Sequence, residues 1–533
     1  MRLTGQSTLF ALCLGTGLLG AAWAAPAAPA QSRLAAVGPD GRLRYTAYTE
    51  QGDQLPDFSF CGYAGGGVPL PVAVVKLSLE PQAGEADDAP RIQQAIDAVS
   101  VLPPGSDGLR GALLLKRGTY RCGTTLHMRA SGVVLRGEGM ATDGTVLIAT
   151  YRTPDPLVKV GGAEGPKAGK SLVEIADAYV PVGATSFTVQ STLSLGVGQK
   201  VYVVRRGNAA WISATGMDHI TPRASDPKST KQWQPFDLKF DRVITGIAGN
   251  RITVDAPIGC AIDRRWGGGA VAGYVDAGRI EHCGVESMRA VSVYDAKKLG
   301  QEKTETVEVD EDHGTWFVDF GAVKNAWVHH LASSKFQQGV IVLQAAAKWV
   351  TVEDCAALDP VSIITGGRRY AYNIQGAQLI LVQRCVADRA RHAFVFGSRV
   401  PGPNVFLDCR ATHNYATSEP HERWSVAGLF DNVEADIALQ DRQWMGSGHG
   451  WSGANYVAWN CRGTLVCQQP PTAQNFAIGF VGRRGKDAFS PRPAGWWESE
   501  GVPVAPRSLY EQQLHDRLTA ASPSPSPIVP PKS

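Results

Sequence analysis

The chain has 533 residues, a formal net charge of +3 and 44% hydrophobic residues. A charge this small excludes a general nucleic-acid-binding protein, so an acidic partner would have to be recognised by local clusters of basic residues. The 59 glycines and 33 prolines are typical of a turn-rich globular protein, with room for one large domain or several smaller ones.

The N-terminus has the pattern of a bacterial secretory signal peptide over residues 1–24. Arg2 supplies a short positive region, an apolar run extends from Leu9 to Leu19, and "AWA" at Ala22–Ala24 forms a cleavage site. The run is too short to span a bilayer, and no second long apolar run follows it. The sequence therefore predicts a secreted or periplasmic protein without stable membrane insertion.

After an N-terminal segment over residues 25–84, the stretch "DDAPRIQQAIDAV" predicts a short helix. It has acidic residues at its start, Pro90 in the first turn, and Ile92, Ala95 and Ile96 on one face. Such a helix could cover the open end of a solenoid. Short strands punctuated by glycine follow, and further strands between residues 185 and 260 indicate an inserted β element.

A repeat can be recognised from three cysteines. Segments that begin at Cys355, Cys385 and Cys409 each place an alanine two positions later, and each follows an alternating, strand-like segment. Cys385 and Cys409 are 24 positions apart, and Cys283 lies 72 positions before Cys355, or three such units. The segment that begins at His330 also places an alanine, Ala332, two positions later. A strand-containing unit that recurs without long helices predicts a solenoid.

The obvious solenoid is an all-β, right-handed parallel β-helix over residues 85–500, carrying the inserted element. Its interior stacks like residues in ladders, which suits buried, unpaired cysteines that behave as small hydrophobic residues. Disulfides are the alternative, and Cys461 and Cys467 could pair with each other. A helix is expected within residues 501–520, where Ser508 and Glu511 are spaced as a capping box. A disordered tail is expected over 521–533.

The chain resembles the pectate-lyase-like superfamily of secreted β-helix proteins. The resemblance rests on "DDAPRIQQAIDA" followed by "LLLKRGTYRCGTTLHMRASGVVLRGEG", a succession of helix, strand and glycine turn that is typical of the first coils in that superfamily. It covers most of residues 85–520 and implies a carbohydrate ligand. It does not define a reaction, because this fold hosts lyases, hydrolases, epimerases and adhesins.

The cysteine frame predicts which side chains stack on neighbouring coils, about 4.8 Å apart. The frame starts at His330, Cys355, Cys385 and Cys409 in four successive coils. Four positions after these residues come, in the same order, Ser334, Asp359, Arg389 and His413. Two positions later come Phe336, Val361, Arg391 and Tyr415. We therefore expect Arg389 beside His413, and Arg391 beside Tyr415, on one outer face. The insertion "GGRRY" (residues 366–370) and the loop "HNYATSEPHERW" (residues 413–424) could fold over that face.

These residue types suit β-elimination on an acidic polysaccharide that contains uronic acid. Arginine pairs with a carboxylate through its bidentate fork, and a neutral histidine with a tyrosine can move the proton. The candidate catalytic residues are Arg391, His392, His413, Tyr415 and His421. The candidate substrate-binding residues are Lys335, Arg369, Tyr370, Arg389, Glu419, Arg423 and Trp424.

Other interpretations stay open. A glycoside hydrolase would need two carboxyl groups flanking the bond, and Asp354, Asp359, Asp388, Asp408 and Glu419 are the candidates. A non-catalytic glycan-binding protein is a third interpretation. Single arginines on β-helix turns are commonly just solvated, Arg384 suits a structural role, and His392 could be a satisfied turn histidine.

Cofactors are not strongly indicated. The run Asp310, Glu311 and Asp312 could hold calcium, but an acidic turn without a metal is the simpler interpretation. No zinc-type spacing, phosphate-binding loop or dinucleotide fingerprint stands in a suitable context. The expected partner is an acidic polysaccharide rather than nucleic acid, and we expect the protein to be a monomer.

Overall fold

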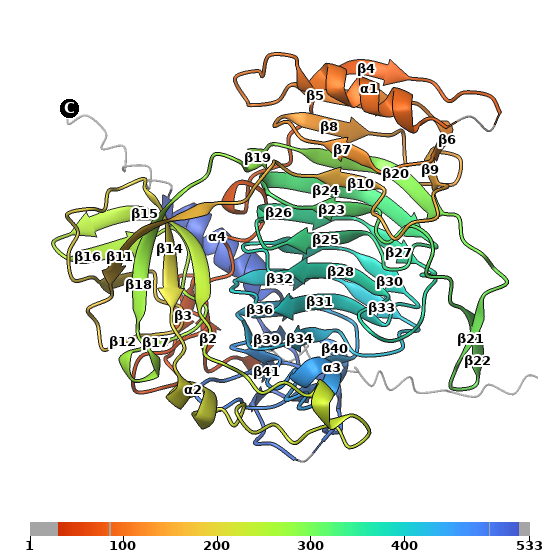
Figure 1. The fold of residues 1–533 in the computed structure, drawn as a ribbon. Coiled ribbons are helices and arrows are strands. Elements are labelled where there is room, and N and C mark those ends of the chain that lie inside the picture. Colours follow the sequence, from red (N-terminus) through yellow and green to blue (C-terminus); the bar gives the residue numbers. More distant parts are fainter. Residues whose placement is uncertain (1–29, 85–86, 490, 522–533) are drawn as a thin grey trace, which may run out of the picture.

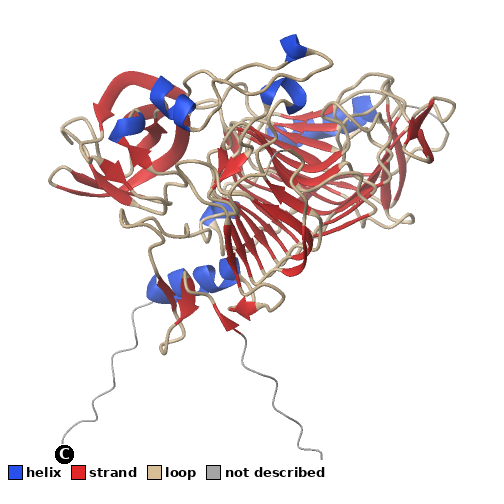
Figure 2. Ribbon diagram, turned by 90° about the horizontal axis from the view of Figure 1, so that it is seen from below, coloured by secondary structure: helices blue, strands red, loops and turns tan. Residues whose placement is uncertain are grey.

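The computed structural model describes residues 30–84, 87–489 and 491–521. They form a right-handed parallel β-helix with a smaller antiparallel sheet beside it, as predicted (Figures 1 and 2). The predicted signal peptide, and all but the first residue of the predicted tail, lie outside these residues. No helix in the described part of the chain is long and apolar enough to cross a membrane.

The strands of the successive coils stack into three parallel faces. Face 1 contains β4 (Val75–Leu79), β5 (Gly111–Leu115), β8 (Val133–Arg136), β26 (Lys348–Glu353), β29 (Leu381–Gln383), β32 (Asn404–Leu407), β36 (Gly428–Asp431), β39 (Val457–Trp459), β41 (Phe476–Ile478) and β43 (Trp496–Glu498). Face 2 contains β6 (Gly118–Cys122), β9 (Thr145–Ala149), β27 (Ala356–Leu358), β30 (Val386–Asp388) and β33 (Arg410–Thr412). The long strands β20 (Gly284–Ser292) and β24 (Val323–Ser334) run through both.

Face 3 is the one that positions the candidate site. It contains β7 (Leu126–Met128), β10 (Val158–Val160), β23 (Val318–Phe320), β25 (Ile341–Gln344), β28 (Tyr370–Gln375), β31 (His392–Ser398) and β34 (Glu419–Glu422). The strands β37 (Ile437–Leu439), β40 (Arg462–Cys467) and β42 (Val481–Arg484) continue the coils toward the C-terminal end. The tight stacking of these short strands brings residues from distant parts of the sequence side by side.

The predicted cysteine ladder is confirmed. Cys355, Cys385 and Cys409 are buried, have free thiols, and lie on consecutive coils, because β27 pairs with β30 and β30 with β33. Cys461 and Cys467 are also free, so the disulfide considered for them does not form. Sulfur therefore serves here as a packing group in the apolar interior.

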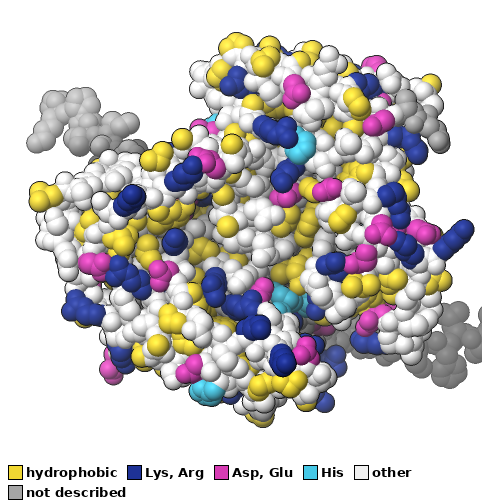
Figure 3. All heavy atoms as spheres, viewed as in Figure 1, with side chains coloured by type: hydrophobic (Ala, Val, Ile, Leu, Met, Phe, Trp, Pro, Cys, Tyr) yellow, Lys and Arg dark blue, Asp and Glu magenta, His cyan; other side chains and the backbone are white. Residues whose placement is uncertain are grey.

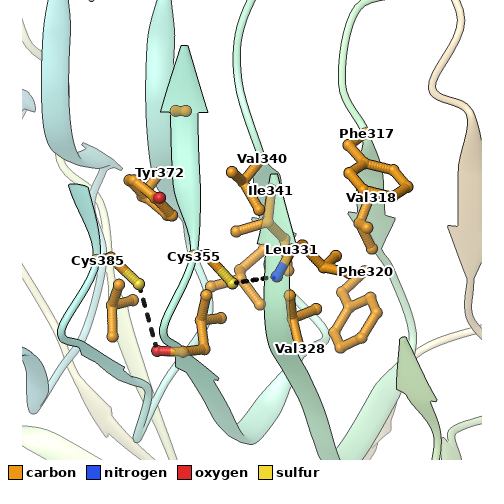
Figure 4. Packing of buried hydrophobic residues seen from close by; sticks show 14 of the residues in the cluster. Phe317, Val318, Phe320, Val328, Leu331, Val340, Ile341, Cys355, Tyr372 and Cys385 are labelled. Atoms are coloured by element: carbon orange, nitrogen blue, oxygen red, sulfur yellow. Dashed lines mark hydrogen bonds between the residues drawn. The ribbon is translucent and has the colours of Figure 1, made fainter. Parts of the chain in front are cut away.

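The predicted alignment of the coils was wrong by one residue at His330, and it was also wrong in placing Cys283 in the same ladder as Cys355. Ala332 pairs with Ala356, so the residues before them, Leu331 and Cys355, are neighbours in the ladder. Leu331, and not His330, therefore occupies the cysteine position in the preceding coil. Its backbone N–H donates to the Cys355 sulfur at 3.4 Å (Figure 4). Cys283 lies in another ladder, beside Ala326. An aliphatic side chain fills the ladder as well as a thiol does, which hides the true register in the sequence.

Two stacks of residues in the left-handed region form corners between strands. Asp354, Arg384 and Asp408 have φ angles of 55°, 51° and 50°, and lie immediately before the cysteines of the ladder. A second stack contains Lys335, Asp359, Arg389 and His413, with φ between 46° and 62°. Short polar residues tolerate this conformation best. All seven residues turn the chain from one face to the next, and this explains the aspartates and His413 but not the arginines or Lys335.

Both predicted helices are present, and the N-terminal one covers an end of the β-helix as predicted. Helix α1 (Ala89–Ser100) buries Ile92, Ala95 and Ile96 against the first coils. Helix α4 (Leu509–Ala521) begins after Ser508, whose hydroxyl accepts a hydrogen bond from the backbone N–H of Glu511 at 3.0 Å. Helix α4 and the N-terminal segment pack together over the outside of face 1. That segment contains β1 (Ala30–Gln31), β2 (Ala35–Val37), β3 (Leu43–Tyr45) and η1 (Tyr63–Gly65).

The inserted element is larger than residues 185–260. Its antiparallel sheet has the order β11 (Lys167–Glu174), β18 (Gly269–Val275), β14 (Lys200–Arg205), β15 (Leu238–Ala248), β16 (Arg251–Val254) and β13 (Ser186–Thr188). The flanking strands β11 and β18 were missed because "KAGKSLVE" is polar and "GAVAGYV" is glycine-rich. A loop from this element, between α2 (Ala209–Ala214) and β15, reaches toward face 3 of the β-helix.

Candidate functional site

A cavity of about 800 Å³ lies over face 3, where the inserted element meets the β-helix. Its floor is formed by residues of β25, β28, β31 and β34, and its rim by the segment around α3 (Met445–Gly448) and by Arg223 of the inserted element. The surface in this region is hollowed, with several Lys or Arg side chains beside a histidine (Figure 3). The cavity thus joins three parts of the sequence that are far apart.

The floor is polar but not acidic. The side chains of Gln338, Asn373 and Gln375 supply amide donors and acceptors, and Trp316 and Trp444 supply aromatic surface. Among the described residues that line the cavity, Glu422 is the only one with a carboxyl group. This combination suits a ligand with many hydroxyl groups and a negative charge.

The centre of the cavity is a hydrogen-bonded pair of Tyr370 and His421. The Tyr370 hydroxyl lies 2.9 Å from Nε2 of His421. On its other side, Nδ1 of His421 lies 2.9 Å from Oε1 of Glu419 and 2.6 Å from Nη1 of Arg442. Tyr370 and His421 are both mostly buried, yet both line the cavity. They can therefore exchange a proton with a bound ligand.

Glu419 and His392 lie beneath this pair and not in the cavity. Glu419 is 1% exposed and forms an ion pair with Arg442 at 2.8 Å. His392 is 2% exposed, and its Nδ1 donates to the backbone carbonyl of Thr417 at 2.5 Å. The ring of His392 lies 4.9 Å from that of His421. Both residues support His421, and neither can touch a ligand directly.

The histidines of the site are neutral over a wide pH range. Burial, reinforced by the positive charges of Arg442 and Arg391, holds the pKa of His421 well below its usual value. Burial is also the main cause that lowers the pKa of His392 and of His449. Burial raises the pKa of Tyr370 to about 12. The site thus holds an uncharged imidazole next to a protonated phenol.

Positive charge in the cavity comes from four arginines, of which two have carboxylate partners. Arg442 pairs with Glu419, and Arg423 pairs with Glu422. For Arg391 and Arg223 no ion pair occurs within the described chain, and the Nη1 atom of Arg391 is buried without a hydrogen-bond partner there. Arg391 therefore has the capacity to bind an anionic group of a ligand.

Three predicted binding and catalytic residues lie outside the cavity, because they attach a hairpin to the β-helix. This hairpin consists of β21 (Leu299–Glu302) and β22 (Glu305–Glu308). Arg389 bonds to Glu305 and to the Tyr415 hydroxyl, and that hydroxyl donates to Glu305 at 3.1 Å. Arg369 is 2% exposed and donates to the Glu308 carbonyl. The backbone of Tyr415 lies beside Ala390 and Arg391 of the preceding coil, as the frame predicted, but its hydroxyl bonds to Arg389.

His413, Lys335 and Trp424 are also placed elsewhere. His413 is exposed at a corner and pairs with Asp388 at 2.7 Å, whereas Arg389 turns to the hairpin. Lys335 lies 4.0 Å from Glu308 and from Asp359, outside the cavity. Trp424 is 1% exposed and packs in the core of the inserted element. Of the sequence candidates, Tyr370, Arg391, His421 and Arg423 line the cavity.

Several residues of the site were not recognised from the sequence. They are Arg223, Glu422, Arg442, Trp444 and His449. Glu422 stands next to His421 and could have been included with it. Arg442 and His449 belong to the glycine-rich segment "RQWMGSGHG", whose glycines indicate a loop but not its direction. Only the stacking of the next coil brings that loop over β34.

Neither group of potential metal ligands suits a cation. His392, Glu419 and His421 converge, but Arg442 already lies against both Glu419 and His421. The second group is His329, Glu353 and Asp354, where Arg384 bonds to both carboxylates, in agreement with its predicted structural role. A fixed arginine charge beside the ligands opposes a metal ion.

The acidic run considered for calcium is also neutralised by cations. Asp310 pairs with Arg152 and Lys298, Asp312 pairs with Lys298, and Glu311 pairs with Arg368. These pairs tie the run to its neighbours and use the oxygens that calcium would need. The run is better explained as a structural turn.

The chain has structural similarity to phage tailspikes and a carrageenase. The tailspike protein gp49 from Pseudomonas phage LKA1 is 13% identical, with a TM-score of 0.43 over 74% of this chain and 57% of that chain. The Gp54 tailspike of Acinetobacter baumannii bacteriophage AP22, solved with a capsular saccharide, is 10% identical with a TM-score of 0.41 (75% and 56%). An iota-carrageenase complexed to iota-carrageenan fragments is 10% identical with a TM-score of 0.31 (75% and 59%).

This chain therefore spans less than three-fifths of the length of those proteins. With TM-scores below 0.5, the similarities assign neither an activity nor a substrate to it. No family model and no curated protein matches the sequence. The β-helix implied by the resemblance to the pectate-lyase-like superfamily is confirmed by the strand topology, whereas membership of that superfamily stays a prediction.

Proposed function

We propose that the protein is a carbohydrate-active enzyme, and specifically a lyase that cleaves a uronic-acid-containing polysaccharide by β-elimination. The observation that carries this proposal is the contact between the Tyr370 hydroxyl and Nε2 of a neutral His421, beside an arginine without a carboxylate partner. An elimination needs a base for the C5 proton, an acid for the leaving oxygen, and a cation for the carboxylate.

We assign the two hydrogens of Arg442 Nη1 to Glu419 and to the His421 carbonyl, 2.8 Å and 2.7 Å away. The proton on His421 is then on Nδ1, where Glu419 accepts it, so that Nε2 is the basic nitrogen. Nε2 takes the proton from C5 of the uronate. The electron pair of that C–H bond forms the C4–C5 double bond, and the bond from C4 to the glycosidic oxygen breaks. Tyr370 gives its proton to that oxygen. The imidazolium then returns a proton to the Tyr370 phenolate across the 2.9 Å contact.

Arg391 is the group best suited to hold the uronate carboxylate. Its charge would stabilise the negative charge that develops on the carboxylate as the C5 proton leaves, which makes that proton more acidic. Gln338, Asn373 and Gln375 would bind sugar hydroxyls, and Trp444 or Trp316 would pack against a ring. Because floor residues such as Tyr370, Asn373 and His421 are largely buried, these interactions would be stronger than in bulk solvent.

A hydrolase is less well supported by the same cavity. Hydrolysis needs two carboxyl groups on opposite sides of the bond, and Glu422 is the only carboxyl among the described lining residues. Glu419 is buried below the floor and paired with Arg442. The aspartates considered from the sequence, such as Asp354 and Asp408, lie at corners and pair with arginines.

The proposal is tested by incubating the purified protein with pectate, alginate, glucuronan and glycosaminoglycans. Elimination creates an unsaturated uronate, so ultraviolet absorbance should rise with one of these substrates and identify it. New reducing ends without that absorbance would replace the lyase by a hydrolase. If neither signal rises with any of the polymers, cleavage of uronate polysaccharides is contradicted.

A further inference from the structure

A second cavity, of about 620 Å³, lies where the inserted element meets the last coils of the β-helix. Its walls come from β14 and from β17 (Ile262–Asp263) in the inserted element, from the loop around Thr472, and from Trp496 of β43. It shares no lining residue with the first cavity. Arg423 and Trp424, adjacent in sequence, line different cavities.

Arg205, the last residue of β14, is the unusual feature of this second cavity. It is 3% exposed, and its Nε and Nη1 atoms are buried without a hydrogen-bond partner in the described part of the chain. No carboxylate oxygen of a described residue lies within 4.0 Å of its guanidinium. Its Cζ atom lies 3.9 Å from the centre of the Trp211 ring. A buried charge without a counter-ion is costly to the folded protein.

Two carboxylates act on the charge of Arg205 from beyond 4.0 Å, Asp237 and Asp263, and Asp237 is exposed to solvent outside the cavity lining. The two carboxylates that line the cavity, Asp53 and Asp263, are used by other groups. Asp53 accepts hydrogen bonds from the Tyr179 hydroxyl, the Thr49 hydroxyl and the backbone N–H of Val182. Asp263 accepts from the backbone and the side chain of Arg265. These acids are held in place, so the guanidinium of Arg205 stays available for an anion that enters the cavity.

The other lining residues indicate what kind of anion would fit. Aromatic side chains of Tyr48, Tyr179, Trp266 and Trp496 share the cavity with amide side chains, of which Gln469 and Gln474 are examples. Aromatic rings next to amides are suited to a sugar, whose apolar faces stack and whose hydroxyls accept and donate hydrogen bonds. A volume of about 620 Å³ accommodates more than one sugar ring.

We propose that this cavity is a second, non-catalytic binding site for a carboxylate-bearing sugar, in which Arg205 pairs with the carboxylate. The inference goes beyond the proposed function, because it assigns a separate site and requires no bond cleavage. The site could hold a distant part of the polymer whose cleavage takes place at Tyr370 and His421. It could equally retain an acidic glycan in a protein without that activity.

The test measures binding of sodium glucuronate and sodium galacturonate, with glucose and galactose as neutral controls. All proteins carry Arg391→Ala, which removes from the first cavity the arginine assigned to the uronate carboxylate. Tryptophan fluorescence reports binding, because Trp266 and Trp496 line the second cavity, and calorimetry confirms it. We expect saturable binding of at least one uronate, about tenfold tighter than that of its neutral counterpart.

Two further variants and one control separate binding from folding. Arg205→Met should weaken uronate binding about tenfold or more, without lowering the melting temperature, since an unpaired buried charge is removed. Ala494→Trp narrows the cavity from an exposed lining position and should also weaken binding. Arg264→Met removes an exposed arginine just outside the cavity and should leave binding unchanged.

Equal uronate affinity in Arg205→Met and in the Arg391→Ala parent would overturn the inference, as would the absence of binding by either uronate. A large loss of stability in Arg205→Met, together with normal binding in Ala494→Trp, would show a structural role for Arg205 and also overturn it. None of these results depends on polysaccharide cleavage. The lyase proposal can fail while this site remains, and the reverse also holds.

Discussion

The Tyr370 hydroxyl lies 2.9 Å from Nε2 of His421, although the two residues are 51 positions apart in the sequence. Tyr370 begins β28, and His421 lies in β34, with β31 between these strands on face 3. His392 of β31 pairs in register with Tyr370, and its ring lies 5.4 Å from Tyr370 and 4.9 Å from His421. The parallel stacking of three coils therefore creates the pair that can move a proton.

Tyr370→Phe removes one oxygen atom and tests that pair directly. We expect the kcat of elimination to fall about 10²- to 10⁴-fold, with little change in melting temperature, because the ring is retained. His421→Gln should have an effect of the same order. Tyr415→Phe is the matched control: its hydroxyl bonds to Glu305 and Arg389 outside the cavity, and kcat should stay near that of the wild type. Normal turnover in Tyr370→Phe would remove Tyr370 from the mechanism.

Arg391→Ala tests recognition of the carboxylate. A hydrogen-bonded charge is worth about 1.5–3 kcal/mol, so kcat/KM should fall roughly 10- to 100-fold. Arg391→Lys should recover only part of this loss, since an ammonium cannot form the bidentate pair. His413→Ala serves as the control for a nearby basic residue, because His413 is exposed and bonded to Asp388. If His413→Ala were the more damaging change, the site would have to be placed on the outer corner.

The fold could be predicted because the sequence repeats the same local pattern. Strand-like segments before Cys355, Cys385 and Cys409 recur with a spacing that a parallel β-helix explains. The register could not be fixed throughout, because Leu331 fills the ladder position as well as a cysteine does. The limits of the inserted element were missed because β11 is polar and β18, which lies between β11 and β14, is rich in glycine and alanine. Neither sequence alternates between apolar and polar residues in the way that marks a strand.

Of the twelve residues predicted for the site, four line the cavity, namely Tyr370, Arg391, His421 and Arg423, and the other eight lie elsewhere. Arg389 and Arg391 differ by two positions, yet Arg389 lies at a left-handed corner and bonds to the hairpin, whereas Arg391 lines the cavity. That difference depends on where β31 begins, and the sequence does not fix this. Arg442 and His449 enter from the loop of a later coil, so no periodic pattern includes them.

The cysteine ladder predicts how the thiols react. The nine cysteines of the described chain are free and buried, and in the ladder burial raises the pKa of Cys355 and of Cys409 well above the usual value of a thiol. Against the effect of burial, the sulfur contacts of Cys385 with these two thiols lower its pKa, but its side chain is 0% exposed, so a reagent has no access to it. The native protein should therefore resist a thiol-specific reagent, and the nine thiols should react after denaturation. Addition of a reductant should leave the melting temperature unchanged. A marked fall in melting temperature would mean that disulfides form in the protein.

The pKa values of the site predict an unusual pH profile for catalysis. His421 must be neutral to act as a base, and its pKa is held well below its usual value by burial and by Arg442. Tyr370 must be protonated to act as an acid, and its pKa is raised to about 12. We expect kcat to be nearly constant from about pH 6 to 9. An acidic limb centred near the ordinary histidine value of about 6.5 would contradict this assignment.

The buried histidines also make stability depend on pH. His392 stays neutral in the folded protein because burial lowers its pKa, whereas in the unfolded chain it binds a proton below about pH 6.5. The unfolded state therefore binds more protons as the pH falls, and each such histidine costs about 1.4 kcal/mol of stability per pH unit below that value.

Asp431 acts in the opposite direction between its ordinary pKa and about 7, because burial raises its pKa to about 7. The pH dependence of the free energy of unfolding therefore contains contributions from several groups. The difference in this pH dependence between the wild type and a variant isolates one of them. His392→Gln keeps a donor for the Thr417 carbonyl but cannot titrate. In urea unfolding between about pH 5 and 6.5, the free energy of this variant should fall less steeply than that of the wild type, by about 1.4 kcal/mol per pH unit. Parallel slopes would mean that His392 takes up a proton within the folded protein.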